Sequence, residues 1–275
     1  FVSDDPLDMR RIIHHTGAEK RLNLVLITVE SLSANFLGVF GDQQSLTPEL
    51  DRLASQGMLF TQLYATGNRT VRGLEALSAA LPPLPGKSVV RWPNVTNLNT
   101  LGATLSARGW SPHFIYGGYG AFDNMNGYFG AQGYKVTDRR NFADGIIEFE
   151  NIWGVADEVL YTQVLRSLDE HAAAGEPAFE MVMTTSNHRP FTFPKGRDAA
   201  ADAHYGTREG ACRYSDWAIG DFLAAGVVGG PERVREGLAR LAQLTDADEF
   251  IVVCDVFDPE LRLRSLDIAA SAMEK

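Results

Sequence analysis

The chain has 275 residues, and 35 acidic against 25 basic side chains give it a net charge of −10 and a pI of about 5.1. A nucleic-acid-binding protein needs basic surface to neutralise phosphates, so this charge argues against one. Hydrophobic residues make up 45% and charged residues 22%, which is typical of a folded globular protein and excludes a disordered chain. The longest apolar run, residues 25–29, is far shorter than the ~20 residues that span a bilayer, so we expect a soluble chain.

The first 21 residues are polar and charged, and the chain begins with Phe1 instead of Met. We interpret residues 1–21 as a linker from a missing N-terminal part, and the chain as a piece of a longer protein. Two cysteines, Cys212 and Cys254, allow at most one disulfide and fit no zinc-ligand spacing.

Apolar segments in the first third of the chain are typical of regular structure. Residues 22–29, LNLVLITV, are rich in β-branched side chains and predict a strand buried on both faces. Residues 47–57 predict a helix, because a threonine can cap its start, a proline follows and a glycine ends it. We expect a second strand at residues 58–64 and, after a polar turn, a helix at residues 74–81.

The alternation of strands and helices continues through the middle of the chain. Helices are expected at residues 101–108, 157–173 and 208–223, and strands at residues 112–116 and 179–183. Such alternation predicts βαβ units. We therefore expect an α/β sandwich with a mostly parallel central sheet and helices on both faces.

The pattern changes near residues 224–230, AAGVVGG. Beyond this point we expect a helix at residues 231–244, a strand at 250–254 and a helix at 259–273. This αβα tail of about 45 residues is too short to form a core of its own. It is expected to pack on the preceding sheet or on another chain.

Polar clusters follow the expected strands or open a helix, where ligands of open α/β sheets bind. The clusters are Glu30-Ser31, Thr70 between Arg69 and Arg72, and Ser186-Asn187-His188. They supply a carboxylate for a hard cation, a hydroxyl nucleophile, cationic groups for phosphate and a general acid. Metal-assisted phosphoryl transfer needs these parts.

Each cluster also has an ordinary structural interpretation. Glu30 can be a solvated loop residue, and Thr70 can serve only as the cap of the following helix. Arg72 can be surface charge, and His188 can bond a loop carbonyl. The remaining histidines have no metal-ligand spacing, and we interpret them as surface or packing residues: His14, His15, His113, His171 and His204.

Six segments between about residues 22 and 223 resemble, in family order, the alkaline phosphatase/sulfatase superfamily. The nearest branch is that of the lipoteichoic acid synthase-like phosphoglycerol transferases. The segments are LVLITVESLSANFLG, LTPELDRLASQGMLF, YATGNRTVRGLEAL, YGGYGAFDNMNGYFG, FENIWGVADE and MTTSNHRPF. The resemblance implies a sulfatase/alkaline-phosphatase-like sandwich, here truncated at its C-terminal end.

The resemblance also implies roles for individual residues. Glu30 would be a metal ligand, and Thr70 would be both a ligand and the nucleophile that forms a phosphothreonine. Asn187 and His188 would face a phospholipid or glycan phosphate head group, with His188 catalytic. Further head-group contacts are expected from Arg72, Asp123 and Asn124. The cofactor would be a divalent metal: Mn, Mg or Zn.

The sequence at the nucleophile favours phosphoester chemistry within this superfamily. The cysteine that sulfatases convert to formylglycine is absent, and the place reads Asn68-Arg69-Thr70. Phosphoester transfer is therefore favoured over sulfate-ester hydrolysis. Such enzymes work outside the cytoplasm, so we expect a membrane-tethered parent protein at the periplasmic face of the inner membrane.

Two departures from the family pattern stand out. Where lipoteichoic acid synthases carry His, Asp, Trp and Arg around glycerol phosphate, this chain has Tyr116, Gly118, Asp123 and Met125. The family also supplies an Asp-His pair of metal ligands after a later strand, and no histidine follows His204. Asp255 is a candidate replacement, or an ordinary loop residue. We therefore expect an incomplete metal site and impaired activity.

The tail, about residues 228–270, resembles the C-terminal end of luciferase-like flavin monooxygenases, in which this piece carries no chemistry alone. The expected organisation is a linker at 1–21, an incomplete sulfatase-like catalytic domain at 22–225 and a luciferase-like fragment at 226–275. Two alternatives to a phosphotransferase stay open: a non-catalytic domain that binds phosphate head groups through Arg72 and His188, and a flavin monooxygenase fragment. No flavin is expected.

Overall fold

The computed structural model of the chain describes residue 17, residues 20–82 and 84–224, and residue 235. Its centre is a four-stranded parallel sheet with the order β1-β6-β2-β3. The strands are β1 (Leu24–Thr28), β2 (Ser111–Tyr116), β3 (Lys135–Thr137) and β6 (Ala178–Met183). A separate antiparallel pair consists of β4 (Glu150–Asn151) and β5 (Gly154–Val155).

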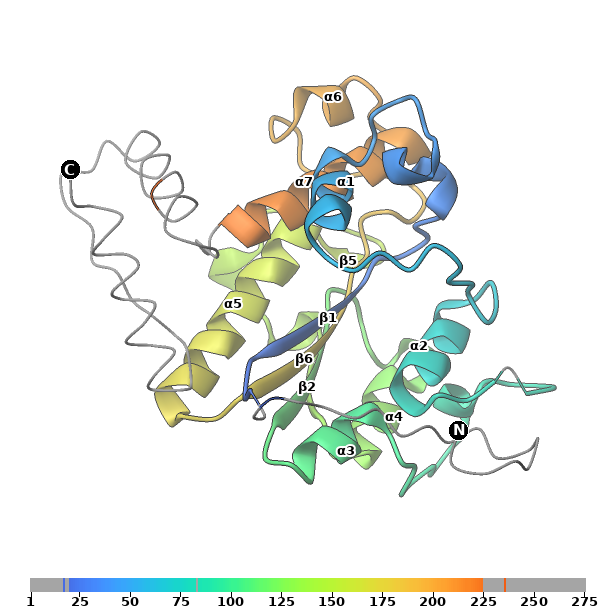
Figure 1. Cartoon of the computed structure of the whole chain (residues 1–275), viewed down its shortest axis with the longest axis vertical. Helices are drawn as coiled ribbons and strands as arrows, with labels where there is room; N and C mark the ends of the chain where they lie inside the picture. Colours follow the sequence, from blue (N-terminus) through green and yellow to red (C-terminus); the bar gives the residue numbers. More distant parts are fainter. Residues whose placement is uncertain (1–16, 18–19, 83, 225–234, 236–275) are drawn as a thin grey trace.

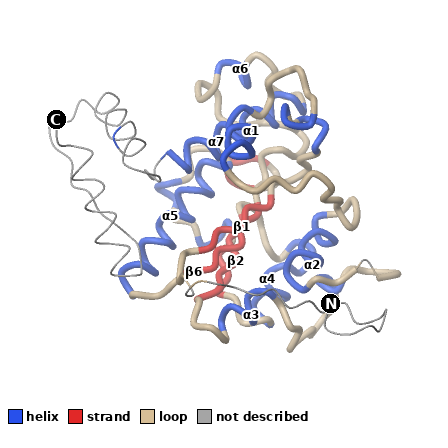
Figure 2. Tube along the Cα trace, in the orientation of Figure 1, coloured by secondary structure: helices blue, strands red, loops and turns tan. Residues whose placement is uncertain are grey.

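Helices connect and cover these strands (Figures 1 and 2). They are α1 (Pro48–Gln56), α2 (Thr70–Ala79), α3 (Leu101–Ser106), α4 (Met125–Ala131), α5 (Asp157–Ala174), α6 (Ala199–Asp202) and α7 (Arg208–Ala224). Short 3-10 helices occur at Ala34–Phe36, Gly38–Phe40, Val89–Arg91, Phe122–Asn124, Arg139–Asn141 and Asp144–Ile146.

Two hydrophobic cores lie on opposite faces of the sheet. One contains Ile115 from β2 together with side chains of α5 and α7, and the other contains Phe114 with side chains of α2 and α4. Phe114 and Ile115 are neighbours that enter different cores, because successive side chains of a strand point to opposite faces. Figure 1 shows α5 and α7 on one side of the strands and α2, α3 and α4 on the other.

The expected α/β architecture, with a mostly parallel sheet and helices on both faces, is confirmed. The strand expected at residues 58–64 is wrong, since this stretch is loop and turn. Met58, Phe60, Leu63 and Tyr64 are 65–83% exposed. A β-prone sequence needs a partner strand and a surface to pack on, and this segment has neither within the described residues.

Helix α4 and strand β3 are not among the elements expected from the sequence. Helix α4 contains two glycines, which weaken its intrinsic helix preference, and its burial of Tyr128 and Phe129 compensates for this. Strand β3 is only three residues long. The helices and strand expected at 231–273 lie outside the described residues. No helix in the part of the chain that the structure describes combines the length and apolarity needed to cross a bilayer.

Asp216 joins α7 to the start of α1. Its two carboxylate oxygens accept hydrogen bonds from the backbone N–H groups of Glu49 at 2.9 Å and Leu50 at 2.8 Å. These amides belong to the first turn of α1, where no intrahelical acceptor exists. The side chain is buried, and burial raises the pKa of Asp216 to about 6, against the lowering effect of the two backbone hydrogen bonds.

The raised pKa of Asp216 predicts a pH-dependent stability. Because the folded-state pKa lies above the unfolded value, the contribution of this group is complete below about pH 4 and is lost as pH rises through about 6. Asp216→Asn does not titrate. The unfolding free energy of this variant, relative to the unmodified chain, should therefore rise by about 2 kcal/mol between about pH 4 and pH 7.5.

Urea unfolding of both proteins across this pH range measures the effect. Asp221→Asn, which removes a carboxylate at an exposed position of the same helix, is the matched control. A pH-independent difference for Asp216→Asn would contradict the raised pKa.

Candidate active site

Glu30 lies at the carboxyl edge of the sheet, two residues after β1. Its backbone N–H donates to Thr184 Oγ1 at 3.0 Å, and its carbonyl accepts from Asn187 Nδ2 at 3.0 Å. Both partners follow β6, the neighbour of β1 in the sheet. The main chain of Glu30 is thus held from the β6 side, and the Glu30 side chain lines the pocket at this edge.

Thr70 is the first residue of α2, and its side chain meets Glu30. Thr70 Oγ1 donates a hydrogen bond to Glu30 Oε2 at 2.9 Å. The N-cap position is Arg69, and no side-chain capping bond is present at this helix start. The interpretation of Thr70 as a mere helix cap is therefore wrong, because its hydroxyl bonds Glu30.

A pocket of about 280 Å³ surrounds this hydrogen bond. Its wall includes side chains from separate parts of the chain: Glu30, Arg69, Thr70, Asp123, Trp153 and His188. The volume is close to the lower end of the range for small-molecule sites. The free amides at the start of α2 and the Arg69 side chain give part of this wall a positive potential.

His188 is held by the segment around it. Its Nδ1 lies 3.0 Å from the Arg189 carbonyl oxygen, and a carbonyl only accepts, so Nδ1 carries the proton of this bond. Nε2 is then the ring nitrogen available to a ligand. The imidazole lies against the Trp153 indole, with ring centroids 4.0 Å apart, and the indole N–H also donates to the Arg189 carbonyl.

Acidic groups also line the pocket, beside the start of α2. Burial, together with the Glu30 and Asp123 carboxylates, raises the pKa of Tyr116 to about 12, so its phenol stays a neutral hydroxyl. Asp123 pairs with Arg91 at 3.0 Å, which offsets part of its charge. A pocket lined by both cationic and anionic groups suits a head group that carries both phosphate and hydroxyl groups.

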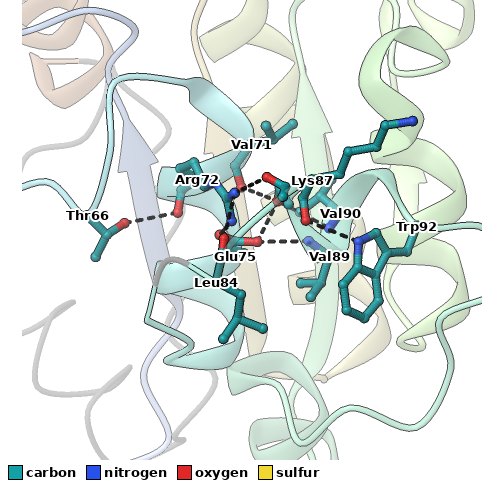
Figure 3. Close-up of polar contacts among 11 residues, drawn as sticks. Thr66, Val71, Arg72, Glu75, Leu84, Lys87, Val89, Val90 and Trp92 are labelled. Atoms are coloured by element: carbon teal, nitrogen blue, oxygen red, sulfur yellow. Dashed lines mark hydrogen bonds and ion pairs between the residues drawn. The ribbon is translucent and has the colours of Figure 1, made fainter.

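Arg72 is not at the pocket, contrary to its expected role in substrate binding. Its guanidinium donates to Glu75 at 2.6 Å and to the carbonyl oxygens of Leu84 and Gly86 (Figure 3). Glu75 in turn accepts from Ser88 Oγ and a neighbouring backbone N–H. Arg72 therefore ties the following loop to α2. The arginine that lines the pocket is Arg69.

Asn124 and Asn187 also hold the main chain instead of lining the pocket. Asn124 Nδ2 donates to the carbonyl oxygens of Val90 and Trp92. Asn187 is fully buried, and its amide holds the Glu30 carbonyl. Of the expected head-group residues other than His188, only Asp123 reaches the pocket. Asp255, the third candidate metal ligand, lies outside the described residues.

Comparison with known proteins decides the family. A model of the sulfatase family matches residues 22–225. The chain belongs to the sulfatase family. A solved structure of an alkaline phosphatase superfamily protein from Vibrio parahaemolyticus is 37% identical, with a TM-score of 0.70 over 79% of this chain and 51% of that chain.

Two further relatives of this sulfatase-family chain have names that refer to phosphoglycerol or to lipoteichoic acid. Phosphoglycerol transferase I of Xanthomonas campestris pv. campestris (strain B100) is 26% identical over 62% of this chain and 26% of the relative. The lipoteichoic acid synthase LtaP from Listeria monocytogenes shares the fold, at 23% identity and a TM-score of 0.65, over 75% of this chain and 52% of that chain. The chain thus spans about a quarter of the curated transferase and half of the solved structures.

The resemblance to the superfamily and to its phosphoglycerol transferase branch is confirmed. The likeness of the tail to flavin monooxygenases concerns residues outside the described ranges. Members of the superfamily generally use a divalent metal. The Glu30 carboxylate and the Thr70 hydroxyl suit a hard divalent ion in kind. These two residues supply only two ligands, whereas a catalytic metal takes about three protein ligands. The described residues therefore fit such an ion only in part.

Proposed function

We propose that this sulfatase-family chain transfers a phosphoglycerol-type head group from a phospholipid or glycan donor through a covalent phosphothreonine at Thr70. The observation that carries the proposal is the 2.9 Å hydrogen bond from Thr70 Oγ1 to Glu30 Oε2 at the start of α2. A hydroxyl in this position has both an acceptor for its proton and an anion-attracting helix start beside it. The relation to phosphoglycerol transferase I supports the choice of head group.

Each pocket residue has a part in the transfer. Thr70 Oγ forms a bond to phosphorus while the bond from phosphorus to the leaving oxygen breaks, and the hydroxyl proton passes to Glu30. Protonated His188 donates from Nε2 to the leaving oxygen. Arg69 pairs with the phosphate oxygens. A hydroxyl of the acceptor then attacks phosphorus and passes its proton to His188 Nε2, while the bond from phosphorus to Thr70 Oγ breaks and Thr70 regains its proton from Glu30.

A divalent ion held by Glu30 and Thr70 would lower the pKa of the threonine hydroxyl and offset the phosphate charge. With two protein ligands in place of three, we expect turnover to be slow. We also propose that the full-length protein is membrane-tethered and acts outside the cytoplasm, where a head-group donor of this kind is reached.

Mass spectrometry tests the covalent step. The full chain is incubated with phosphatidylglycerol vesicles and manganese, and the intact mass and the peptide that contains Thr70 are measured. One glycerophosphoryl group attached to Thr70 is the expected result. Transfer of the head group without any adduct, or an adduct on another residue, would overturn the proposed route.

A second function, phosphate binding without catalysis, is favoured by the shortage of metal ligands. Its cation is Arg69, because Arg72 is held by Glu75 and by carbonyl groups. The Arg69 side chain makes no hydrogen bond or ion pair within the described residues. It is therefore available to a phosphate oxygen.

Arg69→Ala should weaken the binding of inorganic phosphate by roughly 10–150-fold, since a charge-assisted hydrogen bond contributes roughly 1.5–3 kcal/mol. Titration calorimetry in the absence of metal measures the affinity. Arg52→Ala, at an exposed position of α1, is the matched control and should leave the affinity unchanged. Equal affinity in Arg69→Ala and the unmodified chain would exclude this role.

A further inference from the structure

A second cluster of ligand-type side chains lies under the sheet, away from the pocket. Glu180 of β6 and His113 of β2 are register partners, and both lie among side chains of α5. His171, in the last turn of α5, completes the group. The side chains of Glu180 and His113 are 0% and 1% exposed, and that of His171 is 13% exposed. The cluster is at the amino-terminal half of the strands, whereas Glu30 and Thr184 lie beyond their carboxyl ends.

The ligand atoms of this cluster lie close enough together to converge on one metal ion. His113 Nδ1 lies 3.2 Å from Glu180 Oε2, and His171 Nε2 lies 3.7 Å from Glu180 Oε1. All three residues offer ligand atoms within 4.8 Å of one another. Ligand atoms about 2.0–2.1 Å from a tetrahedral zinc ion are about 3.3 Å apart. The contact between His113 and Glu180 already has this length, and the His171 ring would have to move closer to the other two ligand atoms.

Two atoms of the cluster are buried without a hydrogen-bond partner in the described part of the chain: Glu180 Oε2 and His171 Nε2. A buried polar atom without a partner costs free energy, and a carboxylate oxygen more than most. Both atoms point to a ligand that they share. This observation is independent of the residue types and favours a cation.

Neighbouring side chains orient the ligand atoms. His113 Nε2 bonds Thr137 Oγ1 at 2.8 Å, and its Nδ1 bonds Ser167 Oγ at 2.8 Å, so an ion bound at Nδ1 would replace Ser167 as the partner of this ring nitrogen. Ser167 Oγ donates to Glu180 Oε1 at 2.8 Å. Glu176 Oε2 lies 3.9 Å from His171 Nδ1, and a proton on Nδ1 would face it. Outer partners of this kind fix the tautomer and the ring orientation of metal-bound histidines.

We propose that His113, His171 and Glu180 form a structural zinc site that ties α5 to β2 and β6. Two neutral imidazoles and one carboxylate are a ligand set that zinc accepts, and the partly exposed His171 provides a route for the ion. The bound ion takes both unpartnered atoms and neutralises the buried Glu180 charge. The competing arrangement is a metal-free cluster in which Glu180 pairs with a protonated histidine.

Zinc binding by the full chain tests the proposal. After treatment with a chelator and equilibration with zinc, elemental analysis should find an ion that Glu30→Gln retains and His171→Gln loses, in addition to any ion held by Glu30 and Thr70. Zinc at about a hundredfold excess over its Kd should raise the Tm of the unmodified chain by roughly 5–10 °C and that of His171→Gln by far less. His204→Gln, at an exposed position, is the matched control and should behave as the unmodified chain.

A measurement on the unmodified chain keeps the test independent of variant folding. Cobalt should give the visible absorption of a tetrahedral complex, and zinc should displace it. Equal zinc content in His171→Gln and the unmodified chain would overturn the site. So would a zinc-independent Tm, or the absence of a cobalt spectrum in the unmodified chain. Any of these results favours the metal-free ion pair.

Discussion

Thr70→Ala is expected to abolish the glycerophosphoryl adduct and to reduce phosphodiester turnover by roughly 10³-fold or more. The methyl group that replaces the hydroxyl cannot form a bond to phosphorus. The variant also removes the only side-chain hydroxyl that bonds Glu30 Oε2 within the described residues. What remains is binding by the helix amides, Arg69 and His188. Intact mass and the rate with a chromogenic phosphodiester measure both effects.

Thr70→Ser separates chemistry from positioning. It keeps a hydroxyl at the start of α2 but loses the methyl group that restricts rotation about χ1. We expect the adduct to form roughly 10–100-fold more slowly than in the unmodified chain, because the serine hydroxyl spends less time against Glu30. Slow adduct formation in Thr70→Ser and no adduct in Thr70→Ala would identify the side-chain oxygen of residue 70 as the nucleophile.

The matched control for both variants is Thr162→Ala. Thr162 is an exposed threonine of α5 whose hydroxyl bonds the carbonyl of its own helix, so its removal should leave the adduct unchanged. An adduct that persists in Thr70→Ala would contradict the proposed mechanism and direct attention to another hydroxyl of the pocket, such as Ser31 or Thr184.

Some of the site could be predicted from the sequence because local signals place it. An apolar run that ends at Glu30 and a polar turn that opens a helix at Thr70 put both residues at the sheet edge where ligands of parallel sheets bind. The structure brings their side chains together. The expected substrate-binding role of Arg72 was wrong because of the local geometry of a helix. Residues two apart on a helix are about 200° apart around its axis, so Arg72 faces away from Thr70.

Other features depend on contacts that no sequence spacing reveals. Trp153 lies in a segment that carries the family resemblance, but its packing on His188 follows from the turn between β4 and β5. The cluster of His113, His171 and Glu180 draws on two strands and a helix. Only the pairing of β2 with β6 places His113 beside Glu180. His113 and His171 have no metal-ligand spacing in the sequence, so the sequence predicted only surface or packing roles for them.

Asp157 holds the loop that follows β6 and carries Thr184 and His188. Among the variants considered, removal of its side chain is expected to have the largest effect on stability. It is the first residue of α5 and fully buried. One carboxylate oxygen accepts from the backbone N–H groups of Thr185 and Ser186, and the other accepts from Ser215 Oγ of α7. In return, Ser186 Oγ accepts from the Asp157 N–H. Asp157 thus joins the loop after β6 to two helices.

Asp157→Ala leaves two buried N–H donors and one hydroxyl without an acceptor, at about 1–3 kcal/mol for each group. Burial raises the pKa of Asp157, although its hydrogen bonds favour the carboxylate. Removing the acid therefore also relieves the cost of burying it, and this offsets part of the loss. We expect the free energy of unfolding to fall by about 3 kcal/mol, with a smaller fall for Asp157→Asn, which keeps one acceptor.

Urea unfolding measures the change, and Asp221→Ala, at an exposed position of α7, is the control that should stay within about 0.5 kcal/mol. The same loop carries Thr184, which holds Glu30, and His188, which lines the pocket. Asp157→Ala should therefore also slow adduct formation at Thr70 under conditions where the variant is fully folded. A free energy of unfolding for Asp157→Ala within about 1 kcal/mol of that of the unmodified chain would show that Asp157 does not hold this loop in place. The position of His188 would then depend on its contacts with Trp153 and Arg189.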